Sequence, residues 1–146
     1  MVQQFSLDDI MALRIRVLRQ GTPVTHAHYS EDEYPDVVHF GIKQAGDVIA
    51  TSTWFLEECP EAPGLVAMQL KGMAVDTSLQ TAGFGAQLIA AGVALATERN
   101  AEIVWARARD SAIGFYEKCD FRVVGDGFID ESTDMPHHIV IRTLQK

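Results

Sequence analysis

Apolar residues recur along this chain with two different periods, and the period predicts the element that each stretch forms. Spacings of three and four residues, as at Ile10, Leu13 and Val17, place side chains on one face of a helix. By this criterion helices are expected over residues 7–19, 83–99 and 110–118. Runs rich in β-branched and aromatic residues predict strands instead. Such runs cover residues 37–42, 48–56, 65–75, 102–106, 121–124 and 138–144.

The order of these elements indicates the class of fold. Turn residues 44–47 join the first two strands, which are therefore expected to form an antiparallel hairpin. Later in the chain strands alternate with helices, a pattern typical of a sheet with helices on its faces. We predict an α/β (α+β) protein with a mixed sheet. No Pro-, Gly- or Ser-rich stretch divides the chain, so residues 1–146 are expected to form a single domain.

Three local features add detail to this pattern. Gly72 interrupts the strand 65–75, and a glycine inside a strand marks a bulge or a close approach to the backbone. Asn100 is placed to end the helix 83–99 in the left-handed conformation. Residues 26–36 are rich in acidic side chains and lack a period, so we expect a solvated loop there.

The charge balance narrows the choice of partners. The chain has 12 basic and 20 acidic residues and a formal charge of −8. Nucleic acids and anionic membranes are bound mainly by basic side chains, so neither is expected as a partner. An acidic surface favours cationic partners such as amines. The longest apolar run, residues 88–96, is too short to span a bilayer.

The cysteines and the start of the chain bear on the compartment. Cys59 and Cys119 form neither a disulfide framework nor a metal-ligand pattern, and His26-x-His28 lacks a third ligand, so no metal is expected. Free thiols are typical of a reducing compartment. A secretory signal starts with a basic segment that is followed by an apolar one. The start of this chain does not match, because acidic residues stand at positions 8–9. We therefore expect a soluble cytoplasmic protein.

The loop 80–86 is the most informative segment for function. It reads Gln-Thr-Ala-Gly-Phe-Gly-Ala and joins a predicted strand to a predicted helix. The first N–H groups of a helix lack internal partners, so such a junction can bind phosphate. A dinucleotide-binding loop would need a small residue where Leu88 stands, and a P-loop would need Gly-Lys-Ser/Thr. The alternatives left are a different phosphate-binding loop and an ordinary loop-to-helix junction.

Two segments together resemble the signatures of the GNAT family of N-acetyltransferases. The loop 80–86 has Gln80, Gly83 and Gly85 at the matching positions, after a strand segment that reads Leu-Lys-Gly-Met-Ala-Val-Asp. Residues 112–121 read Ala-Ile-Gly-Phe-Tyr-Glu-Lys-Cys-Asp-Phe and are similar to the family pattern A-x-x-F-Y-x-x-x-G-F. The resemblance implies a mostly antiparallel central sheet, of about six to seven strands, flanked by helices. It also implies acetyl-CoA as the co-substrate.

The resemblance further implies which residues hold the cofactor. In this family the pyrophosphate lies against N–H groups of the glycine loop, where a Cβ would keep the phosphate away. The pantetheine arm pairs with the strand before the loop, and a main-chain N–H there can stabilise an oxyanion. We therefore expect acetyl-CoA to contact Met73, Ala74, Val75, Gln80, Thr81, Ala82, Gly83, Phe84, Gly85, Ala86, Arg109 and Ser111.

Catalysis requires an acid for the leaving thiolate and a base for the acceptor amine. Tyr116 aligns with the family tyrosine that protonates the thiolate, and a neutral phenol suits that task. His137, which follows Pro136 near the last strand, is our candidate base because histidine titrates close to neutral pH. The other candidate bases are Glu33, His39 and His138.

The chain departs from the family pattern at three places and leaves the acceptor side open. Ala82 stands where many members have a basic residue, and Arg107 and Arg109 stand in the neighbourhood of an asparagine that touches the cofactor in many members. An arginine there can pair with a phosphate of coenzyme A, the alternative being a solvated surface charge. In addition, Asp120 replaces a glycine, although aspartate tolerates the left-handed conformation. On the first helix, Arg14 or Arg19 is placed to hold a substrate carboxylate, the alternative being a solvated helix face.

The resulting prediction is an N-acetyltransferase that moves an acetyl group directly from acetyl-CoA to a primary amine of a small molecule in a ternary complex. A homodimer is compatible with the sequence. A non-catalytic module that binds or senses coenzyme A is the alternative, because no motif selects the base. Fold resemblance alone does not decide between an enzyme and a binding module.

Overall fold

The computed structural model describes residues 1–20, 22, 26–80, 82–131 and 133–144. Its α-helices are α1 (Leu7–Leu18), α2 (Phe84–Glu98) and α3 (Ile113–Lys118), and its 3₁₀ helices are η1 (Ser30–Glu33), η2 (Thr77–Leu79) and η3 (Asp110–Ala112). Its strands are β1 (Gln3–Phe5), β2 (Val38–Gln44), β3 (Asp47–Leu56), β4 (Ala67–Val75), β5 (Ile103–Arg109), β6 (Arg122–Ile129) and β7 (Pro136–Thr143).

These strands form one seven-stranded sheet in the order β1-β2-β3-β4-β5-β7-β6. The pairs β1–β2, β2–β3, β5–β7 and β6–β7 are antiparallel, which confirms the predicted mostly antiparallel sheet with flanking helices. The sequence pattern missed β1, because three residues are too few to show a period. It also ended β6 at Val124, whereas a register shift lets the strand continue to Ile129.

The chain consists of two compact units. The first unit is Met1–Phe55 with Leu70–Gly92, and the second is Leu56–Gln69 with Val93–Lys146. The expectation of a single domain over 1–146 stays a prediction.

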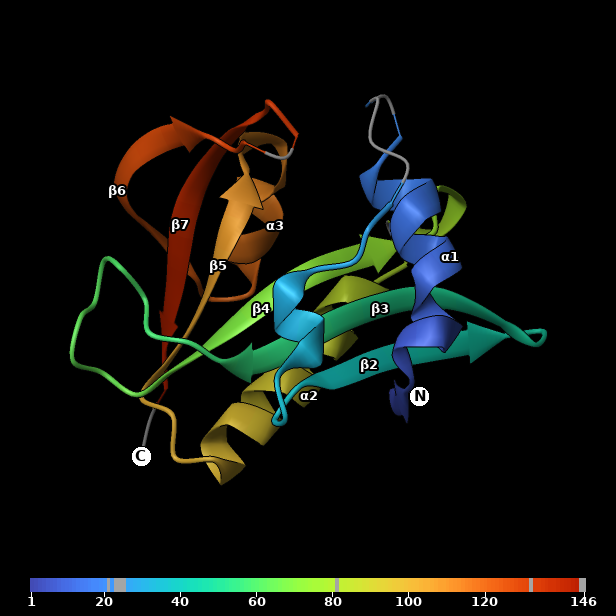
Figure 1. Ribbon diagram of the computed structural model, residues 1–146, viewed down its shortest axis with the longest axis horizontal. Coiled ribbons are helices and arrows are strands. Elements are labelled where there is room, and N and C mark those ends of the chain that lie inside the picture. The colour runs from blue at the N-terminus through green and yellow to red at the C-terminus, as the bar shows by residue number, and fades with distance from the viewer. Residues whose placement is uncertain (21, 23–25, 81, 132, 145–146) are drawn as a thin grey trace. The chain divides into compact units, whose positions relative to one another are not determined.

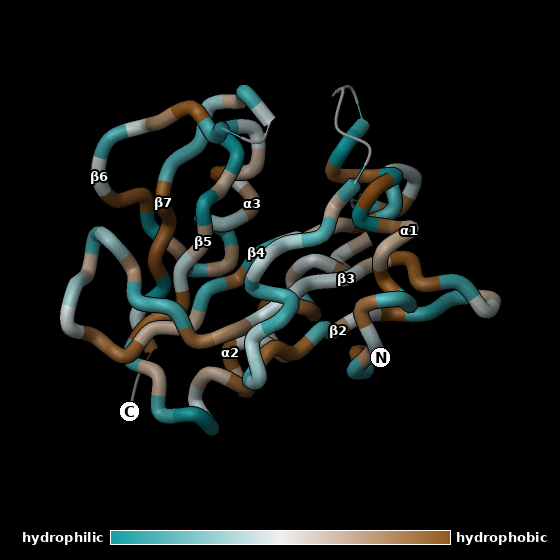
Figure 2. The backbone as a smooth tube through the Cα atoms, viewed as in Figure 1, coloured by the Kyte–Doolittle hydropathy of each residue, from teal (hydrophilic) through white to brown (hydrophobic). Residues whose placement is uncertain are grey.

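In the first unit, α1 and α2 cover opposite faces of the sheet. Thr53 of β3 bonds to Arg14 of α1, and the next residue, Trp54, packs against Gly92 of α2. Successive strand residues point to opposite faces, so the two helices lie on different sides. On the α2 side, Leu88 packs in an apolar cluster with residues of β2 and β3, namely Ile42, Ile49 and Ala50. Along the chain the tube is largely apolar over α2 and hydrophilic at the turn that follows (Figure 2).

In the second unit, β7 lies between β5 and β6 and the sheet again has two distinct faces. One face carries the apolar cluster of Cys59, Ala67, Ile103, Trp105, Ile139 and Ile141. On the other face Arg142 of β7 donates to the carbonyl oxygen of Cys119 at the end of α3. The helix α3 therefore covers the face opposite the apolar cluster, beside β5 and β7 (Figure 1).

The predicted left-handed positions are confirmed, whereas the solvated loop is not. Asn100 and Asp120 have φ of 62° and 70°, in the left-handed region. Residues 26–36, however, contain η1, and Asp32 within it is only 8% exposed. Asp32 is buried because it pairs with Arg14, so the prediction of a wholly solvated loop was wrong.

Gly92→Ala is expected to destabilise the protein by about 1–3 kcal/mol, because the new Cβ would overlap the buried indole of Trp54. Gly114→Ala is the matched control, since among the described residues no atom outside the helix's own backbone and the neighbouring residues lies within 4 Å of a Cβ on this α3 glycine. That substitution is expected to stabilise by about 0.5–1 kcal/mol through backbone entropy and helix propensity. Urea unfolding of the two variants measures both effects, and equal midpoints would contradict the packing assigned to Gly92.

Candidate functional site

The glycine loop of the first unit presents unpaired backbone donors at the start of α2. Gln87 N–H makes the first bond of the helix turn, to the carbonyl oxygen of Gly83, at 3.3 Å. The N–H groups of Phe84, Gly85 and Ala86 find no acceptor among the residues that the structure describes. Gly83 has a φ of 85°, and among the described residues, its two chain neighbours aside, no atom lies within 4 Å of the position that a Cβ would occupy there. This loop is therefore open on the side where an anion would approach.

The segment before these donors is held by its own hydrogen bonds. The N–H of Ala82 donates to the carbonyl oxygen of Leu79 at 3.1 Å, so it is not free for a phosphate as the sequence suggested. Gln80 donates through Nε2 to the carbonyl oxygen of Val75 at 3.2 Å, which ties the loop to the end of β4. Asp76 accepts from the N–H of Ser78 and caps η2. Thr81 lies outside the described residues.

The end of β4 carries the other first-unit residues that were predicted to meet the cofactor. Gly72 has a φ of 66°, which interrupts the strand where the sequence predicted an irregularity. Past this point Ala74 is buried, and the side chains of Met73 and Val75 pack against the apolar cluster that includes Leu88. These contacts fix the strand that leads into the glycine loop.

Tyr116, in the second unit, is 7% exposed and lies between the edges of two aromatic rings. The ring of Phe115 is 5.3 Å away and that of Phe121 is 5.2 Å away, both edge-on. Burial raises the pKa of the Tyr116 hydroxyl well above its usual value, with Cys119 contributing in the same direction. The phenol therefore keeps its proton, and its oxygen has no hydrogen-bond partner among the described residues. Such a group can donate a proton to an anion that forms beside it.

His137, also in the second unit, is held in one tautomer. Its Nδ1 lies 2.9 Å from the carbonyl oxygen of Met135, which can only accept, so Nδ1 carries the proton. Neutral His137 then has its lone pair on Nε2. The ring is 6% exposed and stacks on Phe128 at 5.9 Å. A base needs an unprotonated nitrogen. His137 offers one at Nε2, because the hydrogen bond to Met135 keeps the proton on Nδ1.

Tyr116 and His137 lie on opposite faces of the second unit's sheet. His137 alternates with Ile139 and Ile141 on the face of the apolar cluster. Tyr116 belongs to α3, which covers the other face. Arg109 pairs directly with His137 in the β5–β7 register, whereas Ser111 is exposed in η3. The structure therefore groups Arg109 with His137 rather than with Tyr116.

The remaining candidate bases are engaged in other bonds. His138 Nδ1 lies 2.7 Å from Oδ1 of Asp110, and Glu33 meets His28 at the surface. Burial, followed by the charge of Arg14, lowers the pKa of His39, although Asp32 acts in the opposite direction. Nδ1 of His39 lies 2.8 Å from the Thr53 hydroxyl, which also accepts from Arg14, so His39 belongs to the buried polar network around Arg14.

Comparison with known proteins gives a family for this chain. The model of the acetyltransferase (GNAT) family matches residues 7–121. The chain belongs to the GNAT family. A curated relative, the uncharacterized N-acetyltransferase YitI of Bacillus subtilis (strain 168), is 26% identical over 148 residues, covering 99% of this chain and 96% of that protein.

Solved structures of the same fold are numerous. A putative N-acetyltransferase from Lactobacillus plantarum superposes with a TM-score of 0.79 at 18% identity, covering 99% of this chain and 98% of that one. An aminoglycoside 6′-N-acetyltransferase complexed with coenzyme A superposes with a TM-score of 0.76 at 12% identity, covering 100% and 98%. At these identities the similarity establishes the GNAT fold and leaves the acceptor open.

A buried ionic network in the first unit of this GNAT chain escaped the sequence reading. Arg14, with no exposed surface, donates to both carboxylate oxygens of Asp32 at 2.8 and 2.9 Å. It also donates to Thr53 Oγ1 at 2.6 Å and to the carbonyl oxygen of Ala27 at 2.9 Å. The signal was present, because Arg14 stands four residues after Ile10 on the apolar stripe of α1.

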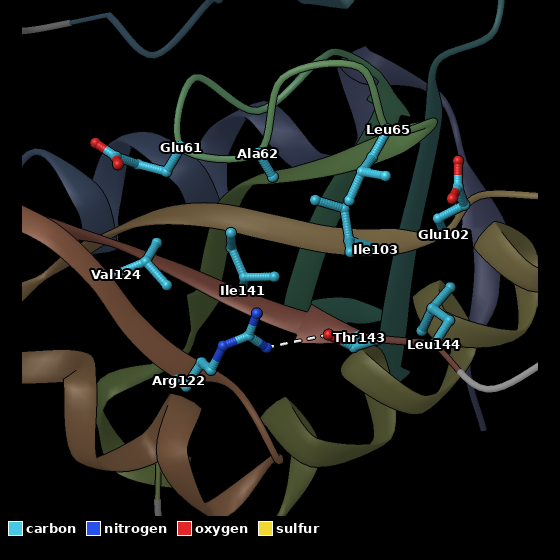
Figure 3. A pocket seen from close by; sticks show the side chains of 10 residues that line it. All are labelled: Glu61, Ala62, Leu65, Glu102, Ile103, Arg122, Val124, Ile141, Thr143 and Leu144. Atoms are coloured by element: carbon cyan, nitrogen blue, oxygen red, sulfur yellow. Dashed lines mark hydrogen bonds between the residues drawn. The ribbon is translucent and has the colours of Figure 1, made fainter.

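The pocket in Figure 3 lies in the second unit and contains none of the predicted site residues. It has a volume of about 290 Å³ and an apolar floor that includes Ile103 and Ile141. At its edge Arg122 donates to Thr143 Oγ1 at 3.0 Å, as the dashed line shows (Figure 3). The pocket uses the end of β7 that is remote from His137.

Two absences concern the described part of the chain. It has no helix that is both long and apolar enough to cross a membrane. Nor do its histidine, cysteine and acidic side chains gather in a group of three or more that could hold a metal ion.

Proposed function

We propose that this protein is an acetyl-CoA-dependent N-acetyltransferase that acylates a primary amine of a small molecule by direct transfer. The observation that carries the proposal is the open glycine loop, with the unpaired N–H groups of Phe84, Gly85 and Ala86. Three convergent backbone donors at a helix start suit a pyrophosphate, and they need no basic side chain at Ala82. Acetyl-CoA supplies the acetyl group as a thioester.

In this proposal different residues bind the cofactor, deprotonate the acceptor and protonate the leaving group. The loop from Gln80 to Ala86 would hold the phosphates, and the main chain of Met73 to Val75 would align the thioester and donate to its carbonyl oxygen. His137 Nε2 would take a proton from the acceptor ammonium. The amine nitrogen then bonds to the carbonyl carbon as the C–S bond breaks, and Tyr116 gives its proton to the departing thiolate. The second proton of the nitrogen would pass to the Tyr116 phenolate, directly or through water, and His137 would release the first to solvent.

Tyr116 and His137 lie on different faces of the second unit's sheet. In this proposal the acid serves the leaving thiolate and the base serves the acceptor amine. Ser111 is on the Tyr116 side and is retained as a cofactor contact. Arg109 shares the His137 side, so we now favour it near the acceptor over the phosphate pairing first expected. A cytoplasmic location and a homodimer remain predictions.

Acetyl-CoA is expected to raise the thermal unfolding midpoint by roughly 5–10 °C at 100 times its Kd, because a ligand of the folded state alone stabilises that state by about 2.7 kcal/mol. NADH and ATP at the same concentration are the controls and should give no comparable shift. No shift with acetyl-CoA would contradict the proposed site. A shift without thiol release across a panel of amines would favour the coenzyme A-binding module over the enzyme.

A further inference from the structure

Three cationic side chains of the first unit surround the ring of Tyr29. The guanidinium carbons of Arg14 and Arg19 lie 4.5 and 5.8 Å from the ring centroid, and Lys71 Nζ lies 4.6 Å from it. Two of these cations have carboxylate partners. Arg14 pairs with Asp32 at 2.8 Å, and Lys71 pairs with Glu31 at 3.0 Å.

Arg19 is the cation without a counter-charge. Its Nε donates to the carbonyl oxygen of His26 at 2.8 Å, and among the described residues its two Nη groups have no hydrogen-bond partner and no carboxylate. The neighbouring residues 21 and 23–25 are Gly, Pro, Val and Thr, none of which carries a carboxylate. This is notable in a chain with 20 acidic residues.

The position of Arg19 favours binding of an anion. Arg19 is only 9% exposed, so its charge has lost much of its hydration. Its Nη groups, however, are not among the buried polar atoms that lack a partner, so they remain open to water and to a ligand. Arg19 is also the C-cap of α1, where the helix dipole favours its positive charge. The Nη groups have no acceptor among the described residues, and a carboxylate matches their planar, paired donors.

The same cluster borders the strand that we assign to the thioester. A Cβ at Gly72 would lie 3.1 Å from Cε2 of Tyr29 and 3.1 Å from Nε of Arg14. Gly72 immediately precedes Met73, so the ring of Tyr29 separates Arg19 from the start of that strand segment. An acceptor whose amine reaches the thioester could extend past Tyr29 to Arg19.

We propose that Arg19 binds a carboxylate of the acceptor, so that the substrate class is a primary amine that also carries a carboxylate, such as an amino acid. This inference rests on the proposed acetyltransferase function. A single free guanidinium matches one negative charge. A phosphate dianion would need further cations, and Arg14 and Lys71 are already neutralised by their own partners.

The test uses ω-amino acids of increasing length, each paired with its carboxamide, in an assay of thiol release from acetyl-CoA. For at least one length, kcat/KM is expected to be about 10- to 100-fold higher for the acid than for the amide. This ratio corresponds to the free energy that a hydrogen-bonded ion pair contributes to binding. Arg19→Gln should remove that preference and leave the KM of acetyl-CoA unchanged. Arg19→Lys should retain part of it, because it keeps the charge without the fork.

Arg122→Gln is the matched control, since this exposed arginine is distant in the chain and, among the described residues, pairs with Thr143 alone. Binding of the N-acetyl product acids, measured by calorimetry on the wild type and on Arg19→Gln, separates the two proposals. Equal rates for acids and amides, or a preference that survives Arg19→Gln, would overturn the carboxylate site and leave the acetyltransferase standing. Arg19-dependent binding of the acids without turnover of any amine would support the site and overturn the transferase.

Discussion

Tyr116→Phe is expected to lower kcat about 100-fold while changing the KM of acetyl-CoA less than about twofold, the effect of removing a general acid. The ring stays between Phe115 and Phe121, so the packing is preserved and only the hydroxyl is lost. Because burial raises the pKa of this hydroxyl, the proton is present throughout the neutral range and is available to the thiolate. Steady-state kinetics with a saturating amine measure the change.

Tyr34→Phe is the matched control, because it removes a phenol hydroxyl from a ring that packs edge-on against Phe55 in the first unit. It should leave kcat unchanged. A rise in the KM of acetyl-CoA at constant kcat for Tyr116→Phe would show that the hydroxyl serves binding, and an unchanged kcat and KM would remove Tyr116 from the mechanism.

Arg14→Gln is expected to destabilise the protein by about 3–5 kcal/mol, because it leaves the carboxylate of Asp32 buried without its partner. The matched control is Arg16→Gln, two residues later on the same helix. Arg16 pairs with Asp76 at 2.9 Å, but its side chain is 56% exposed, so water solvates the charges in either state. Urea unfolding should therefore separate the two variants clearly. Similar midpoints for both would show that the buried pair is not a stabilising contact.

The pH dependence of stability gives an independent check on the same network. Burial opposes ionisation of Asp32, but hydrogen bonds from Arg14 and the Tyr29 N–H, with the charge of Arg14, outweigh it and lower its pKa. The contribution of Asp32 is therefore full above the ordinary aspartate pKa of about 4 and is lost as the pH falls below it. The lowered pKa of His39 adds a loss that begins near pH 6.5, at about the ordinary histidine pKa. Arg14→Gln should flatten the acid limb of the wild-type curve.

The sequence anticipated the local elements because they depend on local chemistry. The helical stripe through Ile10 and Leu13 predicted α1 to within one residue of its observed end. Asn100 and Asp120 adopt the left-handed conformation expected of them. The glycine loop and the segment around Tyr116 likewise indicated the family that the comparison established. The short strand β1 was missed because its pairing with β2 is its main support.

By itself the sequence determined the fold class, the family and the segment that presents free N–H groups, since each depends on residue type and spacing along the chain. Only the tertiary structure decided which charges are buried and paired. Arg14, Arg16 and Arg19 look alike in the sequence, yet the first is neutralised by Asp32, the second is solvated and the third has no carboxylate partner in the part of the chain that the structure describes. The structure also narrowed the set of N–H groups in the glycine loop that can bind phosphate. The N–H of Ala82 donates to the carbonyl oxygen of Leu79 in a turn, so three N–H donors at the start of α2 remain without an acceptor among the described residues. The cost of burying a charge depends on neighbours that are distant in sequence, and folding alone brings them together.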